Sequence, residues 1–209
     1  MSIIKLENIS KTYGIRTVLK DYSIEIEDKE FICITGESGK GKTTLLNIMG
    51  MLDYPDSGNV YIFNQKNPKL DSKKGREILR HNLTYVFQNY GLVDDRTVRY
   101  NLEINLEYLK NKKTVDLKKA LEEVGLDESY LKMKVYELSG GEQQRVALAK
   151  LFLRDYSLVL ADEPTGSLDS INRDKIMNIF CKLHDSGKTI IIVTHDKEVA
   201  KCAGRIIEL

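Results

Sequence analysis

The feature that most constrains this chain is a glycine-rich octapeptide between a short apolar run and a leucine pair. Its residues, followed directly by Thr44, are Gly36, Glu37, Ser38, Gly39, Lys40, Gly41, Lys42 and Thr43. The spacing fits G-x-x-x-x-G-K-[S/T], and its flanks predict a strand before it and a helix after it. Glycines let the backbone amides converge on one point, and the helix start adds unpaired N–H groups and a positive dipole end. The segment therefore predicts a loop that binds phosphate.

The charged and hydroxyl residues of this loop suit a nucleotide with magnesium. Lys42 supplies a positive charge for the β- and γ-phosphates, and the Thr43 hydroxyl supplies a ligand for Mg²⁺. Two lysines on one turn become tolerable when a polyphosphate lies between them. The alternative interpretation is a glycine-rich turn that only caps a helix. A phosphate loop alone does not choose among kinases, GTPases and motor ATPases.

The apolar runs predict an α/β fold. Short β-branched runs that suit strands buried on both faces are Phe31–Thr35, Leu158–Ala161 and Thr189–Thr194. Each leads towards a segment that suits a helix, namely Thr43–Met51, Ser170–His184 and Lys197–Cys202. This alternation predicts a mainly parallel sheet with crossover helices. Near the N-terminus an antiparallel β subdomain is expected from alternating strands at Ile3–Ile9, Tyr22–Ile26 and Asn59–Phe63.

We expect a single domain over residues 1–209, with a helical lobe inserted in it. The pattern becomes helical between Gln88 and Leu138, with leucines or valine at spacings of three or four. These residues are Leu102, Leu106, Leu109, Leu117, Leu121 and Val124. The expected core is therefore 1–87 and 139–209, and the inserted α-helical subdomain is about 88–138.

Composition excludes several classes of protein. The chain has 32 basic and 31 acidic residues, so it has no strong field for a nucleic-acid backbone, and no nucleic-acid partner is expected. No apolar run approaches the roughly 18 residues of a membrane span. Three widely spaced cysteines suggest reduced thiols in the cytoplasm. Any role at a membrane should therefore depend on a partner.

Two carboxylates follow the apolar run Leu158–Ala161. Asp162, at the carboxyl end of the predicted strand, can reach the shell of a Mg²⁺ ion. Glu163, one residue further, is placed to orient or deprotonate a water molecule in line with the γ-phosphate, which makes it the candidate general base. A solvated strand end is the alternative interpretation.

A second anion site is indicated by Leu138-Ser139-Gly140-Gly141-Glu142-Gln143-Gln144-Arg145. Ser139 and Glu142 fit the S-x-x-E capping box of a helix start. Because Gly140 and Gly141 carry no side chains, the first turn also presents bare amides and a dipole to an anion. The chain already has one phosphate loop, so this second site needs a different phosphate or a different chain.

These motifs resemble the ATP-binding-cassette (ABC) ATPases over nearly the whole chain. The segment LSGGEQQR matches the family signature, and five further landmarks stand in the family's order. They are the phosphate loop, Gln88, the Asp162-Glu163 pair, the D-loop Ser167-Leu168-Asp169, and His195.

The resemblance implies that two copies close head to tail around two ATP molecules, so that the chain forms a homodimer on ATP binding. Ser139, Gly140, Gly141 and Glu142 would face the γ-phosphate held at the partner's phosphate loop, and Asp169 would lie nearby. Gln88 is similar to the Q-loop glutamine that contacts Mg²⁺ or water, and His195 to the histidine that steadies Glu163. Tyr13 matches the aromatic that stacks on adenine, and Mg²⁺ would be held by Thr43, Gln88 and Asp162. Catalysis would fall to Lys42, Glu163, His195 and Gln88.

Within the family, the chain is similar to the ATPases of macrolide efflux, lipoprotein release and, in its short form, bacteriocin export. The expected partner is a separate integral membrane permease, which would place the chain on the cytoplasmic face of the cell membrane. Tyr90, Leu92, Val93 and a helix beginning near Thr97 would form the docking surface beside Gln88. Two alternatives stay open: a scaffold or signalling ATPase that moves no cargo, and a soluble ATPase acting on nucleic acid or ribosomes.

Overall fold

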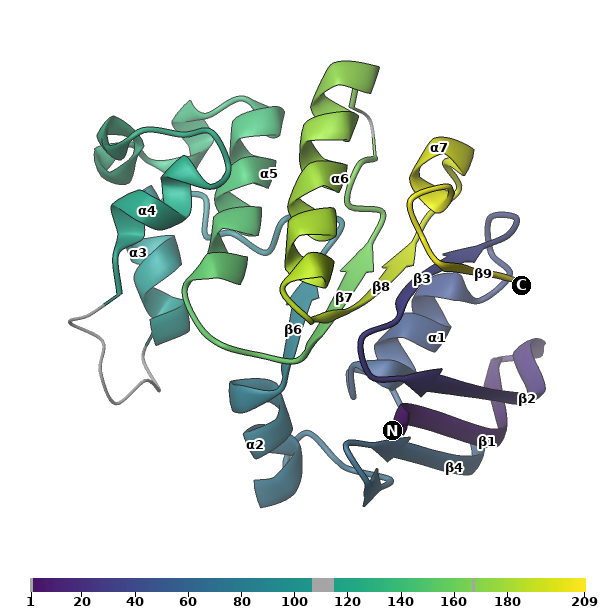
Figure 1. The fold of residues 1–209 in the computed structure, drawn as a ribbon. Coiled ribbons are helices and arrows are strands. Elements are labelled where there is room, and N and C mark those ends of the chain that lie inside the picture. Colours follow the sequence, from purple (N-terminus) through teal and green to yellow (C-terminus); the bar gives the residue numbers. More distant parts are fainter. Residues whose placement is uncertain (1, 107–114, 167) are drawn as a thin grey trace. The chain divides into compact units, whose positions relative to one another are not determined.

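The computed structural model describes residues 2–106, 115–166 and 168–209, so Leu109 and Ser167 lie outside the described residues. Its strands are β1 (Ser2–Tyr13), β2 (Arg16–Glu27), β3 (Phe31–Thr35), β4 (Ser57–Ile62), β5 (Gln65–Lys66), β6 (Leu83–Val86), β7 (Leu158–Asp162), β8 (Thr189–Val193) and β9 (Arg205–Glu208). Its α-helices are α1 (Lys42–Met49), α2 (Lys73–His81), α3 (Val98–Glu103), α4 (Leu117–Glu122), α5 (Gly140–Ala149), α6 (Ser170–Asp185) and α7 (Lys197–Ala200) (Figure 1). Short 3-10 helices are η1 (Ile104–Leu106), η3 (Glu128–Lys132), η4 (Val135–Glu137) and η5 (Lys150–Phe152).

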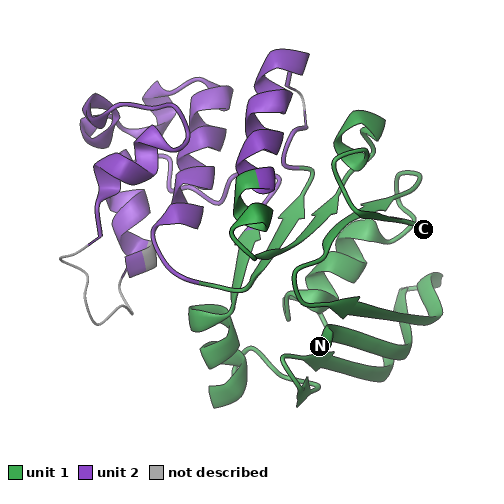
Figure 2. Ribbon diagram, viewed as in Figure 1, with its two compact units in different colours: residues 1–85, 156–163, 182–209 green, residues 86–155, 164–181 purple. Residues whose placement is uncertain are grey.

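The chain forms two compact units, which Figure 2 shows in different colours. Unit 1 comprises residues 1–85, 156–163 and 182–209, and unit 2 comprises residues 86–155 and 164–181. Within the described residues, no helix has the length and apolar character needed to cross a membrane.

Unit 1 contains both sheets, which confirms the predicted α/β fold. The larger sheet has the strand order β6-β7-β8-β3-β9, and the pairs β7–β8, β8–β3 and β3–β9 are parallel. The smaller sheet has the order β2-β1-β4-β5, and its pairs are antiparallel. β7 and β8 are buried at every position, as expected of central strands covered on both faces.

One hydrophobic core joins the two sheets of unit 1. Apolar side chains of α1 pack into the same cluster as residues of β1, β3, β7 and β8. Its most buried members include Ile4, Ile34, Leu46, Leu160 and Ile191. Because α1 is fixed against both sheets, the loop that leads into it has a rigid base.

Unit 2 is mainly helical. Its buried apolar residues come from α3, α4, α5, the first part of α6 and the short 3-10 helices, and include Leu102, Leu121, Leu131, Val146 and Phe180. Its helices begin at short polar caps: Thr97 accepts a bond from the Tyr100 amide, and Asp116 accepts bonds from the first turn of α4. The α3 cap lies where the sequence predicts a helix start.

Candidate active site

The phosphate loop runs from the end of β3 to the start of α1, and glycine is required at its two ends. Gly36 has φ 143° and Gly41 has φ 98°, values that residues with side chains rarely adopt. A Cβ on Gly36 would lie 2.4 Å from the Leu209 carbonyl oxygen, and one on Gly41 would lie 2.6 Å from a methyl group of Val18. The backbone can follow this path only without side chains at these positions.

Lys42 is the buried cation of the loop. Its side chain is largely buried, and Nζ donates to the carbonyl oxygens of Gly36 and Glu37, both at 2.8 Å. Among the described residues no carboxylate forms an ion pair with it. A buried ammonium with only neutral acceptors favours an anionic ligand. The side chains of Glu37 and Lys40 are exposed and pair with each other at 3.6 Å.

Thr43 and Asp162 meet at the carboxyl end of β7. The Thr43 hydroxyl donates to Asp162 Oδ1 at 3.2 Å. Asp162 is 6% exposed, and its pKa is raised, first by burial and then by the neighbouring charge of Glu163. Two adjacent carboxylates and a hydroxyl are hard oxygen donors of the kind that Mg²⁺ prefers, so these residues fit such an ion. Thr43 and Asp162 would hold it, and it would neutralise phosphate charge there.

Glu163 and His195 lie together although their strands are far apart in sequence. The Nδ1 atom of His195, just beyond β8, lies 2.8 Å from Glu163 Oε1. A carboxylate can only accept, so Nδ1 must carry the hydrogen in this contact. Glu163 also has φ 46°, an unfavourable backbone conformation for a residue with a side chain. Its amide donates to the Val193 carbonyl oxygen at 2.9 Å, which holds this conformation in place.

The signature segment forms the predicted capping box at the start of α5. The Ser139 amide donates to Glu142 Oε2 at 2.8 Å, and the Glu142 amide donates to Ser139 Oγ at 3.4 Å. The Tyr130 hydroxyl donates to Glu142 Oε1 at 2.7 Å, a contact that the sequence pattern does not indicate. Bonds from Ser139 and then Tyr130 lower the pKa of Glu142 to about 2, so its carboxylate is ionised at neutral pH.

The two signature glycines have room for side chains within this chain. A Cβ on Gly140 would lie 3.9 Å from its nearest neighbour, the Tyr90 hydroxyl. A Cβ on Gly141 would lie 3.8 Å from Arg145 Nη1, and neither glycine has a positive φ. Glycine is a poor helix former, so the fold of this chain does not explain the pair.

The remaining predicted residues lie on turns and strand ends. Gln88 is exposed on the turn after β6. Asp169 is exposed before α6, where its carboxylate accepts bonds from the Asn172 amide at 2.9 Å and from the Asn172 side chain at 2.6 Å. Tyr13 ends β1 and is 49% exposed. The roles of Gln88, Asp169 and Tyr13 in the candidate site therefore stay predictions.

One contact of the phosphate loop is not indicated by any of the sequence motifs. Arg16, the cross-strand neighbour of Tyr13, donates from Nη2 to the Gly39 carbonyl oxygen at 2.7 Å. The turn around Gly14 was a signal for this hairpin, since it places Arg16 directly opposite Tyr13.

Comparison with known proteins decides the family. A family model described as ABC transporter matches residues 19–166. The chain belongs to the ABC transporter family. It is 40% identical to the uncharacterised ABC transporter ATP-binding protein MJ0796 of Methanocaldococcus jannaschii, over 99% of this chain and 93% of that protein. A dimeric structure of that protein matches 99% of this chain and 94% of the solved chain with a TM-score of 0.89.

A second group of relatives is fused to permeases. The chain is 40% identical to the macrolide export ATP-binding/permease protein MacB of Escherichia coli, over 99% of this chain. It spans about a third of the length of that relative, 33%. The family match, together with the likeness to a cassette solved in a post-hydrolysis state with ADP and phosphate, identifies the chain as an ATPase.

Proposed function

We propose that this ABC ATPase hydrolyses Mg²⁺-ATP in sites shared between two copies of the chain and thereby drives a separate membrane permease. One observation carries the proposal: Gly140 and Gly141 form a bare helix start that the fold itself does not require. A helix start without side chains suits a phosphate presented from outside the chain. The dimeric structure of the MJ0796 cassette supports a second copy as the source.

In this arrangement each residue of the site has a definite task. The phosphate loop and Lys42 would bind the phosphates, and Thr43 and Asp162, whose side chains meet at 3.2 Å, would hold Mg²⁺. Glu163 accepts the proton of the attacking water, and His195 keeps its carboxylate oriented through the 2.8 Å contact. Ser139 and Gly141 of the partner subunit would bind the γ-phosphate, and Asp169 would lie close to that seam. A single copy then lacks a complete site.

Dilution tests the shared site. ATP turnover per molecule should fall as the protein is diluted below its dimerisation range, because two copies are needed for each active site. The rate at low concentration should therefore rise with about the square of the protein concentration. A turnover number that stays high and constant on dilution would contradict the shared site, whereas loss of ATP binding in Lys42→Ala checks the phosphate loop separately.

The membrane partner would dock on unit 2. Phe87, Val93, Tyr100 and Ile104 are large apolar or aromatic side chains that are each 40–44% exposed. All four belong to the segment around the predicted Q-loop and α3. Their exposure supports a permease contact on this surface, with the chain held at the cytoplasmic face of the membrane.

We further propose export as the direction of transport, with a peptide, lipoprotein or antimicrobial compound as cargo. The support is the likeness of the chain to the macrolide export ATP-binding/permease proteins MacB. The test is the sensitivity of a deletion strain to macrolides and to antimicrobial peptides. Complementation with the wild-type gene should restore resistance, and complementation with Glu163→Gln should not. Equal restoration by both would favour a scaffold that moves no cargo.

A further inference from the structure

The tip of the β1–β2 hairpin is attached to the phosphate loop on one side. Tyr13 and Arg16 are paired across the turn, and Arg16 donates to the Gly39 carbonyl oxygen at 2.7 Å. A Cβ on Gly39 would lie only 3.0 Å from this guanidinium group, so the contact is close. This bond links the tip of the hairpin directly to the phosphate loop.

On its other strand, β1, the tip is attached to Asp53, which lies four residues after Met49, the last residue of α1. The Tyr13 hydroxyl donates to Asp53 Oδ2, and Lys11 Nζ donates to Asp53 Oδ1 at 2.8 Å. The same ammonium lies over the Tyr13 ring, 5.2 Å from its centroid. One carboxylate thus binds the hydroxyl of the aromatic ring and the cation that covers one of its faces.

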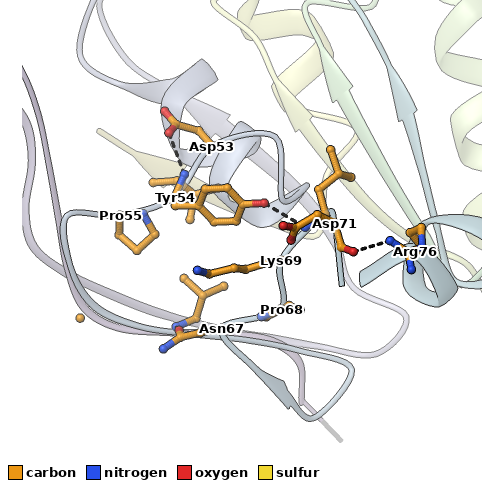
Figure 3. A pocket seen from close by; sticks show the side chains of 12 residues that line it. Asp53, Tyr54, Pro55, Asn67, Pro68, Lys69, Asp71 and Arg76 are labelled. Carbon is orange, nitrogen blue, oxygen red and sulfur yellow. Dashed lines mark hydrogen bonds between the residues drawn. The ribbon is translucent and has the colours of Figure 1, made fainter. Parts of the chain in front are cut away.

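The segment that carries Asp53 is itself anchored. The Tyr54 amide donates to Asp53 Oδ1 at 2.7 Å, and the Thr12 amide donates to Asp56 Oδ2 at 2.7 Å. The Tyr54 hydroxyl accepts a bond from the Leu70 amide at 2.9 Å, inside a pocket of about 770 Å³ that Asp53 also borders (Figure 3). Bonds in several directions therefore hold this carboxylate in one place.

The charge of Asp53 is stable at neutral pH. Partial burial opposes ionisation, but the bonds from Lys11 and Tyr13 outweigh it and lower the pKa of the carboxyl. The side chains of Lys11 and Asp53 are only 12% and 24% exposed, so water screens their pairing weakly. Tyr13 nevertheless remains 49% exposed, which leaves ring surface open to a planar ligand.

We propose that Asp53 is a positioning residue for the nucleotide base: it fixes the Tyr13 ring as a preformed stacking platform at a set distance from the phosphate loop. The proposal rests on the proposed ATPase function and on the role that the family resemblance implies for Tyr13, which is to stack on the base. A ring that is already ordered loses little conformational entropy when a base binds. The strength of stacking depends on the area of the base and not on the pattern of its hydrogen-bond donors and acceptors. The platform therefore suits purine nucleotides in general.

The experiment compares a ligand that has a base with one that lacks it. Equilibrium affinities for Mg²⁺-ATP and for inorganic tripolyphosphate are measured by displacement of a fluorescent ATP analogue. The variants are Asp53→Ala, Tyr13→Ala, their combination, and Tyr13→Phe, which keeps the ring but lacks the hydroxyl. Asp71→Ala is the matched control, because Asp71 borders the same pocket without contacting Tyr13. Thermal unfolding of each variant checks that it is folded.

The expected result is selective for the base. Asp53→Ala, Tyr13→Phe and Tyr13→Ala each weaken ATP binding, by roughly three- to tenfold for the loss of an ordered stacking partner. Tripolyphosphate binding stays at the wild-type value, and the double variant binds ATP no more weakly than Tyr13→Ala. Asp71→Ala binds both ligands as the wild type does.

Three results would overturn the proposal. In the first, Asp53→Ala binds ATP normally although Tyr13→Ala does not. In the second, Asp53→Ala weakens tripolyphosphate as much as ATP, which would assign Asp53 to the phosphate loop or to general stability. In the third, Tyr13→Ala has no effect, so that no platform exists. Failure of the proposed function itself is separate, since it would appear as a turnover number that stays high and constant when the protein is diluted.

Discussion

Nδ1 of His195 and Oε1 of Glu163 lie 2.8 Å apart, across the ends of two neighbouring parallel strands. The side chain of Glu163 is 15% exposed and that of His195 is 74% exposed. The carboxylate is thus sheltered while the imidazole beside it still faces solvent. This geometry suits a base whose orientation is set by a neighbour that can itself reach a ligand.

Replacing Glu163, the proposed general base, should separate ATP binding from hydrolysis. In Glu163→Gln the side chain keeps its shape but cannot take a proton, so steady-state hydrolysis should fall by roughly 10²- to 10⁴-fold. The dissociation constant for ATP should stay close to the wild-type value. Turnover assays and equilibrium binding measure the two quantities. Glu77→Gln, which changes an exposed residue of α2, is the control, and hydrolysis near the wild-type rate in Glu163→Gln would remove Glu163 from the base role.

Ionised Asp162 should lower the stability of the protein although hydrolysis depends on it. Burial raises its folded pKa, so the ionised form is disfavoured in the fold, and the protein loses stability as pH rises from the ordinary pKa of 3.8 through the raised value. At neutral pH, Asp162→Asn removes that cost and should unfold at the same or a higher temperature. Its Mg²⁺-dependent hydrolysis should nevertheless be abolished. A clear drop in melting temperature with activity retained would show that Asp162 serves the fold instead.

Replacing Gly141 of the signature segment should, like replacing Asp162, lower hydrolysis without lowering the stability of the protein. Gly141→Ala meets no neighbour closer than 3.8 Å and favours the helix by up to about 1 kcal/mol, so its melting temperature should hold or rise by roughly 2–4 °C. Hydrolysis should fall on the order of tenfold to a thousandfold, because the new methyl group crowds the anion site. Gly58→Ala is the contrasting control. Its Cβ would lie 2.4 Å from a backbone oxygen, so this substitution should destabilise the protein. Full activity in Gly141→Ala would contradict the role of this helix start.

Glu142 should make the stability of the protein depend on acid pH. Its folded pKa, about 2, lies below the ordinary value of 4.5, so the stability that its carboxylate contributes is complete above the ordinary value. That contribution is lost as pH falls from the ordinary pKa through the folded one. The difference in unfolding free energy between the wild type and Glu142→Gln should therefore be constant at neutral pH and shrink in acid. Urea unfolding at several pH values measures it, and a difference that does not vary with pH would exclude the ionised capping box.

The motifs with fixed local geometry were predicted from the sequence. The helix predicted at Thr43–Met51 is α1 (Lys42–Met49), and the capping box predicted at Ser139 and Glu142 is present. Helix α2 was missed, because it is strongly polar and buries only Gly75 and Ile78. Its cap, Ser72, was the available signal, since it accepts a bond from the Gly75 amide.

Features that depend on tertiary contacts could not be predicted. The positive φ of Glu163 follows from its bond to Val193 on another strand, and no local pattern specifies it. Asp53 stands 40 residues from Tyr13, and only the folded β1–β4 sheet with its loops brings the two together. Carboxylates on loops are common in sequences, so Asp53 carried no signal of its own.

The most direct test of the shared site is the mass of the ATP-loaded Glu163→Gln protein in solution, measured by light scattering. This variant should double its mass when Mg²⁺-ATP is added. With Gly141→Asp added, which places a negative charge where the partner's γ-phosphate should bind, it should bind ATP equally well and remain a monomer. A Glu163→Gln protein that stays monomeric with ATP bound, or a dimer that Gly141→Asp leaves unchanged, would contradict the account.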